Sequence, residues 1–146
     1  MADIALNNSE AGLAPVPMIS EAALSIAKTI ALHNGEDVVV LDLSVHSGWT
    51  DRFVIATATS SAHLRGLERF IDEEAARLGF DRLHKKSLAD DDEWLLVDLG
   101  PIVVHVMTHA ARSFYELEKL WFQAPATTVS PLSLSETRED HSSKSS

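Results

Sequence analysis

Two aspartates stand where metal-binding carboxylates are often found, because each closes a hydrophobic segment that resembles a strand. They are Asp42 and Asp98. Two-metal nucleotidyl transfer needs a second carboxylate two residues along, so that alternate residues of one strand point at the same ions. Ser44 and Gly100 occupy these second positions. The sequence therefore favours structural or binding roles for both aspartates and predicts no catalytic residue.

His105 is a further candidate ligand, and it lies in an apolar segment. Strand alternation places its side chain on one face with Val103 and Met107. A metal site would need further ligands at short spacing, and the sequence contains no His-x-Glu or HExxH pattern. A hydrogen-bonded histidine within a sheet is the favoured interpretation, and an interface residue is the alternative.

The acidic run Asp90–Glu93 precedes Trp94. It lacks the spaced ligands and the turn glycine of an EF-hand calcium loop. A solvated loop is the simpler interpretation, and electrostatic attraction to a basic partner is the alternative. We therefore expect no metal ion and no other cofactor.

Aromatic residues beside acidic ones form the best candidate for a binding surface. Alternation along a strand puts Trp94 and Asp98 on one face, and Tyr115 and Glu118 are three residues apart on a predicted helix. Trp and Tyr combine a large contact area with one polar group, which suits them to anchor interfaces. For Trp94 an interface role and a core role are both open, whereas Trp121 is expected in the core.

The hydrophobic pattern between residues 20 and 123 predicts the elements that position these residues. A helix capped by Ser20 ends at Asn34-Gly35, and a helix capped by Ser60 or Ser61 ends at Gly79. Predicted strands cover residues 38–41, 53–56, 94–99 and 102–108, with a weaker candidate at 82–86. A last helix capped by Thr108 has the apolar stripe Ala110, Phe114, Leu117 and Trp121. Two pairs of strands without an intervening helix predict a mixed sheet.

The hairpin between the last two predicted strands turns at Gly100-Pro101. Proline fixes its φ near −65°, which excludes a type I′ turn because that turn needs positive φ at both central residues. Type II′ fits, with Gly100 supplying the positive φ.

Length and composition are those of one soluble globular domain. The chain has 146 residues, is 45% hydrophobic, lacks cysteine and carries a formal charge of −10. Such a charge disfavours nonspecific binding to phosphate backbones and suits a basic protein partner. No apolar run approaches the ~18 residues of a membrane span, and the N-terminus lacks the pattern of a secretory signal. The cytoplasm is the expected location.

Both ends differ in composition from the predicted domain, residues 20–123. Residues 1–19 mix Asn, Ser, Ala, Gly and Pro without a sustained period and are expected to form a flexible leader. Residues 124–146 are rich in Ser and Thr and are expected to form a disordered tail.

Several motifs, in order and at compatible spacing, resemble the ribosomal silencing factor (Iojap) family. They are Asp51-x-Phe-Val-Ile-x-Thr-x-Thr-Ser-Ser-x-His63, Trp94-x-x-x-Asp98-x-Gly100, Val104-His105-Val106 and Arg112-x-x-Tyr115-x-Leu-Glu118-x-Leu-Trp121. The resemblance spans roughly residues 20–123. It implies a small mixed sheet of about five strands with flanking helices, related to nucleotidyltransferases but without their catalytic carboxylates.

By the same resemblance, the function is regulatory and not enzymatic. It implies binding to the L-fourteen protein of the large ribosomal subunit, a steric block of small-subunit joining, and repression of translation under nutrient limitation. Asp51, Trp94, Asp98, His105, Tyr115 and Glu118 are the candidate partner-binding residues. Direct specific contact with nucleic acid and with membranes is not expected.

Three residues depart from the family pattern and bear on local loop geometry. Arg52 stands where an aromatic or small residue is common, Ala58 where glycine is usual, and Pro101 where aspartate is common. Two other functions are kept as alternatives. One is a nucleotidyltransferase-like enzyme with retained nucleotide binding, and the other is a dimeric scaffold; a weak homodimer is also compatible with ribosome binding.

Overall fold

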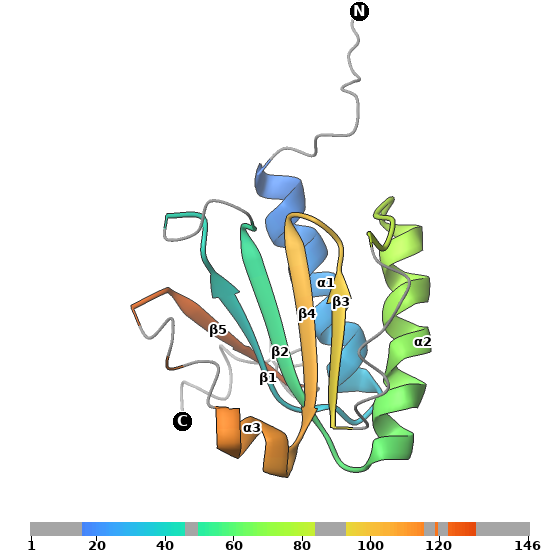
Figure 1. The fold of residues 1–146 in the computed structure, drawn as a ribbon. Helices are drawn as coiled ribbons and strands as arrows, with labels where there is room; N and C mark the ends of the chain where they lie inside the picture. Colours follow the sequence, from blue (N-terminus) through green and yellow to red (C-terminus); the bar gives the residue numbers. More distant parts are fainter. Residues whose placement is uncertain (1–15, 46–49, 84–92, 116–118, 120–122, 131–146) are drawn as a thin grey trace, which may run out of the picture.

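The computed structural model describes residues 16–45, 50–83, 93–115, 119 and 123–130, with residues 16, 17 and 115 in backbone only. Three helices and five strands follow one another along this part of the chain (Figure 1). In order they are α1 (Val16–Leu32), β1 (Glu36–Asp42), β2 (Arg52–Ala58), α2 (Ser61–Arg77), β3 (Trp94–Asp98), β4 (Ile102–Thr108), α3 (His109–Tyr115) and β5 (Ala126–Val129).

The five strands form one mixed sheet in the order β3-β4-β2-β1-β5. The central pair β2 and β4 is parallel, and the other three pairs are antiparallel. The parallel pair needs a crossover, and α2 lies between β2 and β4 in sequence. The predicted α/β class and mixed sheet of about five strands are therefore confirmed.

The sheet has a buried cluster on each face. On the first face, α1 and α2 pack their apolar stripes against β-branched strand residues, with Ile26, Ile30, Leu64 and Ile71 at 2% exposure or less. We call the opposite side the second face. Its buried residues are Leu41, Leu43, Phe53, Ile55, Val103, Met107, Ala111 and Ala124. The short helix α3 lies at one end of this second face (Figure 1).

Local signals place the ends of α2 and the β3–β4 hairpin as predicted. The Ser60 hydroxyl accepts a hydrogen bond from the amide of His63, and Gly79 adopts a φ of +92° just after the helix. Gly100 has a φ of +93°, and the Leu99 amide donates to the Ile102 carbonyl at 2.9 Å. These observations confirm the Ser60 cap, the two-residue turn and the positive φ at Gly100.

Both predicted domain boundaries need correction. Helix α1 begins at Val16 and not at Ser20, because buried Ile19 extends the apolar stripe by one turn. Pro17 is compatible with this start, since a first-turn amide has no helical acceptor. At the other end, β5 falls within the predicted tail. Its threonines suit a strand, and Val129 is 5% exposed against the first-face cluster.

Two further sequence predictions also change. Residues 82 and 83 form no strand, and residues 84–86 of that candidate lie outside the described residues. The predicted stripe of the last helix is wrong at Ala110 and Phe114, both of which are exposed, whereas Ala111 is buried. Leu117 and Trp121 of that stripe lie outside the described residues.

Candidate functional site

The two strand-closing aspartates cannot share a metal ion. Both lie where their strands end, on the same side of the sheet's strand ends. The strands β1 and β3 are three strand spacings apart, however, which is roughly 14 Å. The strand register also puts them on opposite faces, because Asp42 alternates with Val40 of the first face and Asp98 pairs with Val103 of the second. A two-metal site holds its ions ~4 Å apart.

The carboxylates of both aspartates have structural partners. Asp42 Oδ1 accepts from the Arg52 guanidinium at 3.1 Å and from the Ser44 hydroxyl at 2.7 Å. Asp98 Oδ1 accepts from the amide of Gly100 at 2.9 Å and so stabilises the hairpin turn. Within the described part of the chain, no group of three or more His, Asp or Glu residues could hold a metal ion.

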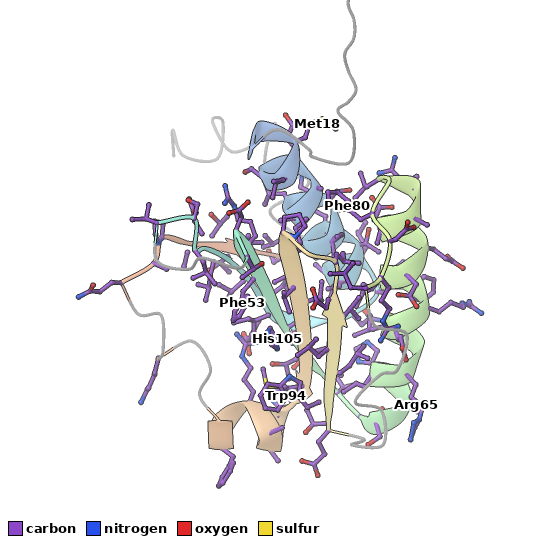
Figure 2. The ribbon with its side chains drawn as sticks, turned by 45° about the horizontal axis from the view of Figure 1, so that its top comes forward. Met18, Phe53, Arg65, Phe80, Trp94 and His105 are labelled. Carbon is purple, nitrogen blue, oxygen red and sulfur yellow. The ribbon has the colours of Figure 1, made fainter. Side chains whose placement is uncertain are left out.

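Trp94 and His105 form a hydrogen-bonded pair on the second face. The indole Nε1 of Trp94 donates to Nδ1 of His105 at 3.1 Å, and the two ring centroids are 5.8 Å apart. On its other side the imidazole meets the ring of Phe53, at 4.6 Å between centroids. Figure 2 shows Phe53, His105 and Trp94 following one another across this face, with Trp94 nearest α3.

The surroundings of His105 keep its ring neutral and in one tautomer. Burial lowers the pKa of His105 from 6.5 to about 4. An indole N–H can only donate, so Nδ1 accepts and the ring proton sits on Nε2. That Nε2 is buried and has no hydrogen-bond partner among the described residues, a situation that costs ~1–3 kcal/mol of folding free energy.

The assignment of His105 to a surface that touches a partner is therefore corrected. Its side chain is 4% exposed, so it offers a partner almost no contact area. The sequence-based interpretation of a hydrogen-bonded sheet histidine is the one that the geometry confirms. Trp94 is half-buried and packs against the second-face cluster while part of its ring reaches the surface.

The other candidate residues lie at two ends of the sheet. Asp51 is half-buried beside the β3–β4 turn, where its amide donates to the Pro101 carbonyl at 2.9 Å, and Asp98 closes β3 at the same edge. Trp94 lies at the opposite end of β3, about 14 Å away along the strand. The structure thus separates the acidic candidates Asp51 and Asp98 from the aromatic one.

The last helix lies at the Trp94 end of the sheet, because Thr108 at the end of β4 leads directly into α3. The backbone of Tyr115 ends this helix; its side chain and all of Glu118 lie outside what the structure describes. The predictions for Tyr115 and Glu118 therefore remain predictions.

Arg112 fixes α3 to the sheet, and sequence reasoning had given it no role. Its guanidinium donates to the carbonyl of Asp37 at 2.7 Å and to Thr57 Oγ1 at 2.9 Å. Asp37 lies at an irregularity in β1 and has a φ of +48°. This contact turns the opposite side of α3 outward, and Phe114 is 79% exposed there. The sequence placed Phe114 in the core-facing stripe and so did not single out this exposed aromatic side chain.

Arg82 forms a second clamp, on the outer edge of β3. Its side chain is 8% exposed, and the guanidinium contacts Glu68 at 2.7 Å and Asp72 at 3.2 Å. It also donates to the carbonyl of Leu96 at 3.5 Å, and the next amide, of Leu83, donates to the carbonyl of Asp98 at 2.8 Å. The sequence signal was the i, i+4 pair of acids on one helix, followed by an arginine shortly after the helix ends.

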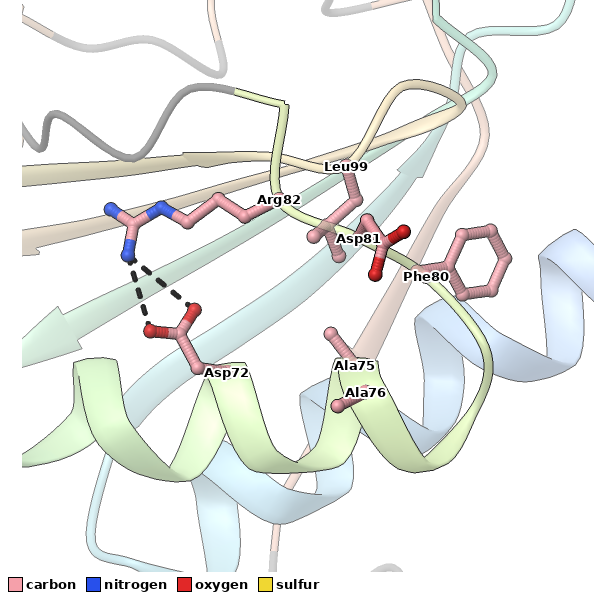
Figure 3. A pocket seen from close by; sticks show the side chains of 7 residues that line it. All are labelled: Asp72, Ala75, Ala76, Phe80, Asp81, Arg82 and Leu99. Atoms are coloured by element: carbon pink, nitrogen blue, oxygen red, sulfur yellow. Dashed lines mark hydrogen bonds and ion pairs between the residues drawn. The ribbon is translucent and has the colours of Figure 1, made fainter.

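A shallow pocket of about 200 Å³ lies beside Arg82 (Figure 3). Its lining is Asp72, Ala75, Ala76, Phe80, Asp81, Arg82 and Leu99. Two of its three charged residues, Arg82 and Asp72, already pair with each other at 3.2 Å. The pocket therefore gives no support to an enzymatic site.

The comparison with known families assigns the chain to one of them. The sequence model described as "Ribosomal silencing factor during starvation" matches residues 17–146. The chain belongs to the ribosomal silencing factor family. The match begins one residue after the start of α1 and includes β5, so it extends beyond both sequence-based boundaries.

Individual relatives support this assignment. The ribosomal silencing factor of Treponema pallidum is 39% identical over 101 residues, which are 68% of this chain and 89% of the relative. The mouse protein "Mitochondrial assembly of ribosomal large subunit protein 1" is 37% identical over 60% of this chain and 40% of its own length. A crystal structure of a protein from Chromobacterium violaceum is 30% identical and superposes with a TM-score of 0.63, over 74% of this chain and 87% of the other.

Membership of this family makes the chain a ribosome-related regulator of translation, as the sequence motifs predicted. Among the described helices, none has the length and apolar character needed to cross a membrane.

Proposed function

We propose that this protein binds the large ribosomal subunit through the L-fourteen protein, sterically blocks joining of the small subunit, and so represses translation when nutrients are scarce. It acts in the cytoplasm by binding alone, without a chemical step. Membership of the ribosomal silencing factor family carries the proposal. The name of the mouse relative, which refers to the large ribosomal subunit, supports that subunit as the partner.

The proposed contact surface is the α3 end of the second face. Trp94 is half-buried there, Phe114 is 79% exposed, and Arg112 holds the helix in place. Partly exposed aromatic side chains on a rigid support are typical interface anchors. Tyr115 and Glu118 belong to the proposal on the strength of their sequence motif alone.

The charge of the whole chain favours a basic partner. The chain carries 22 acidic against 12 basic residues, and Asp51 and Asp98 lie at the turn end of the same sheet. A basic ribosomal protein is electrostatically complementary to such a chain, and the attraction raises the association rate more than the affinity. Raising the salt concentration is therefore expected to slow binding, since the screening length falls from ~10 Å at 0.1 M to ~3 Å at 1 M.

The alternative of a nucleotidyltransferase-like enzyme has less support. It would need carboxylates that converge on shared ions, whereas Asp42 and Asp98 lie on opposite faces and are engaged in local hydrogen bonds. Magnesium-dependent binding of a nucleotide in calorimetry would favour this alternative, and we expect none.

Binding of alanine variants to purified large subunits tests the proposal. We expect Trp94→Ala, Phe114→Ala and Tyr115→Ala each to weaken binding by about thirtyfold, equivalent to ~2 kcal/mol, because interface anchors typically contribute this much. Leu32→Ala is the matched control, since Leu32 is also an exposed apolar residue, at 60%, but ends α1 on the other side of the sheet.

Thermal stability separates binding defects from folding defects. A core tryptophan cut to alanine costs ~3–5 kcal/mol of folding free energy. If Trp94→Ala has a much lower melting temperature but binds normally at temperatures where it is folded, Trp94 belongs to the core and the proposed surface is misplaced. If wild-type protein fails to co-sediment with large subunits at low salt, the proposed function itself is wrong.

A further inference from the structure

We propose that His105 is a positioning residue that holds the indole of Trp94 in one orientation, so that Trp94 presents an apolar surface to the partner. The inference rests on the proposed function and adds two points to it. It gives a role to a buried histidine that makes no contact with the partner. It also names the chemistry of the Trp94 contact, which is packing against aliphatic groups and not hydrogen bonding.

The hydrogen bond fixes which edge of the indole faces inward. Nε1 is the one polar atom of the tryptophan side chain, and it donates to Nδ1 of His105 at 3.1 Å. Because His105 is 4% exposed, this bond points from the surface into the second-face cluster. The part of the half-buried indole that reaches the surface is therefore carbon only.

The imidazole itself is held from several directions. Its ring lies 4.6 Å from that of Phe53, with 60° between the ring planes. In the sheet, His105 lies opposite Leu96 of β3 and Ile55 of β2. These contacts hold the ring in place, and a half-turn of the ring would put a carbon where Nδ1 is and break the hydrogen bond to Trp94.

The Nε2 of His105, unpaired within the described residues, costs folding free energy, and this cost points to a role for the imidazole beyond packing. Nε2 of His105 is buried without a hydrogen-bond partner in the described residues, and an aliphatic side chain at this position would avoid that loss. Locally unfavourable features of this kind are expected where a protein prepares a functional site. What the imidazole supplies here, and a leucine would not, is the acceptor for Trp94.

Three substitutions at position 105 separate acceptor geometry from simple packing. In His105→Asn the amide oxygen can take the place of Nδ1, whereas in His105→Gln the amide lies one bond farther out, near the place of Nε2. His105→Leu removes the acceptor altogether. We expect His105→Leu and His105→Gln to weaken binding to purified large subunits by about tenfold, the order of one hydrogen bond, and His105→Asn to stay within about threefold of wild type.

A double-mutant cycle tests whether His105 acts through Trp94. Trp94→Phe removes the indole N–H, so His105→Leu is expected to cause less than about a twofold further loss in that background. If the fold-losses in affinity of the two substitutions multiply, His105 acts independently of Trp94, and the proposal is overturned. Binding of His105→Gln at the wild-type level would overturn it too, and this comparison with His105→Asn remains valid if His105→Leu does not fold.

The indole resonance of Trp94 in a ¹⁵N–¹H spectrum reports the hydrogen bond without any ribosome. It is assigned by its absence in Trp94→Phe. Hydrogen exchange of this group should be slow in wild type and His105→Asn and clearly faster in His105→Leu and His105→Gln. Unchanged exchange in all four proteins would refute the positioning role. If the exchange pattern holds but wild-type protein does not bind the subunit, the proposed function fails while the Trp94–His105 geometry stands.

Discussion

Acidification should destabilise this protein through His105. Burial lowers the pKa of the folded histidine to about 4, whereas an unfolded histidine titrates near 6.5. Above the unfolded value both states are neutral at this position, and the contribution of His105 to stability is fully present. As the pH falls from 6.5 toward 4, the unfolded chain binds a proton that the folded protein does not, so folding loses free energy.

The expected loss follows from the separation of the two pKa values. A difference of one pKa unit corresponds to ~1.4 kcal/mol, so the whole interval amounts to about 3 kcal/mol at this single site. About 2 kcal/mol of it falls between near-neutral conditions and about pH 4.5. Domains of this size have total stabilities of ~5–15 kcal/mol, so the effect is large enough to measure.

Urea unfolding at several pH values, for wild type and for His105→Asn, provides the assay. Other titrating groups contribute to both proteins, including Glu74, whose pKa is lowered by its hydrogen bond to Arg77. The difference in unfolding free energy between the two proteins therefore isolates His105. We expect the wild-type advantage to shrink by about 2 kcal/mol from neutral pH to about pH 4.5. A difference that stays constant with pH, or that grows on acidification, would refute the neutral, buried histidine.

Three other substitutions have clear structural expectations. Gly66→Ala should raise the unfolding free energy by about 0.5–1 kcal/mol, since Gly66 lies inside α2 with nothing within 4 Å of an added Cβ; an unchanged or lower melting temperature would contradict this. Gly35→Ala should lower it by roughly 2 kcal/mol, because the added Cβ would lie 2.9 Å from the carbonyl oxygen of Ile30; a neutral result in urea unfolding would show that the turn relaxes freely. Arg82→Met should cost about 2 kcal/mol, since it leaves two α2 carboxylates without their cation, and a wild-type urea midpoint would show that this clamp adds nothing.

The sequence predicted well those parts of the fold that depend on local chemistry. Ser60 caps α2 through its own hydroxyl, and Gly100 meets the positive φ of a two-residue turn that Pro101 restricts. Strand alternation correctly placed Trp94 and Asp98 on one face of their strand, and His105 on one face with Val103 and Met107. The strand register shows that these two faces are the same side of the sheet. The family resemblance drawn from the same segments was confirmed by the family match.

The failures involve contacts between segments that are distant in sequence. The short strand β5 has no hydrophobic signal of its own and exists because β1 offers it a pairing edge. The exposure of Phe114 depends on Arg112, which reaches Asp37 and Thr57 far away in the chain. An interface role for His105 stayed open as the alternative until its partner Trp94 and its 4% exposure were known. Such pairings are set by tertiary packing, which no local pattern contains.

Titration of the protein into a subunit-joining assay tests the central claim most directly. A steric block must occupy its site on every subunit, so inhibition should saturate near one protein per large subunit and should disappear when the protein is washed away. An enzyme that modified ribosomes would act at a small fraction of the subunit concentration and leave a lasting effect. We predict near-equimolar, reversible inhibition that weakens at high salt. Full inhibition at about a tenth of the subunit concentration, or inhibition that persists after washing, would contradict the account.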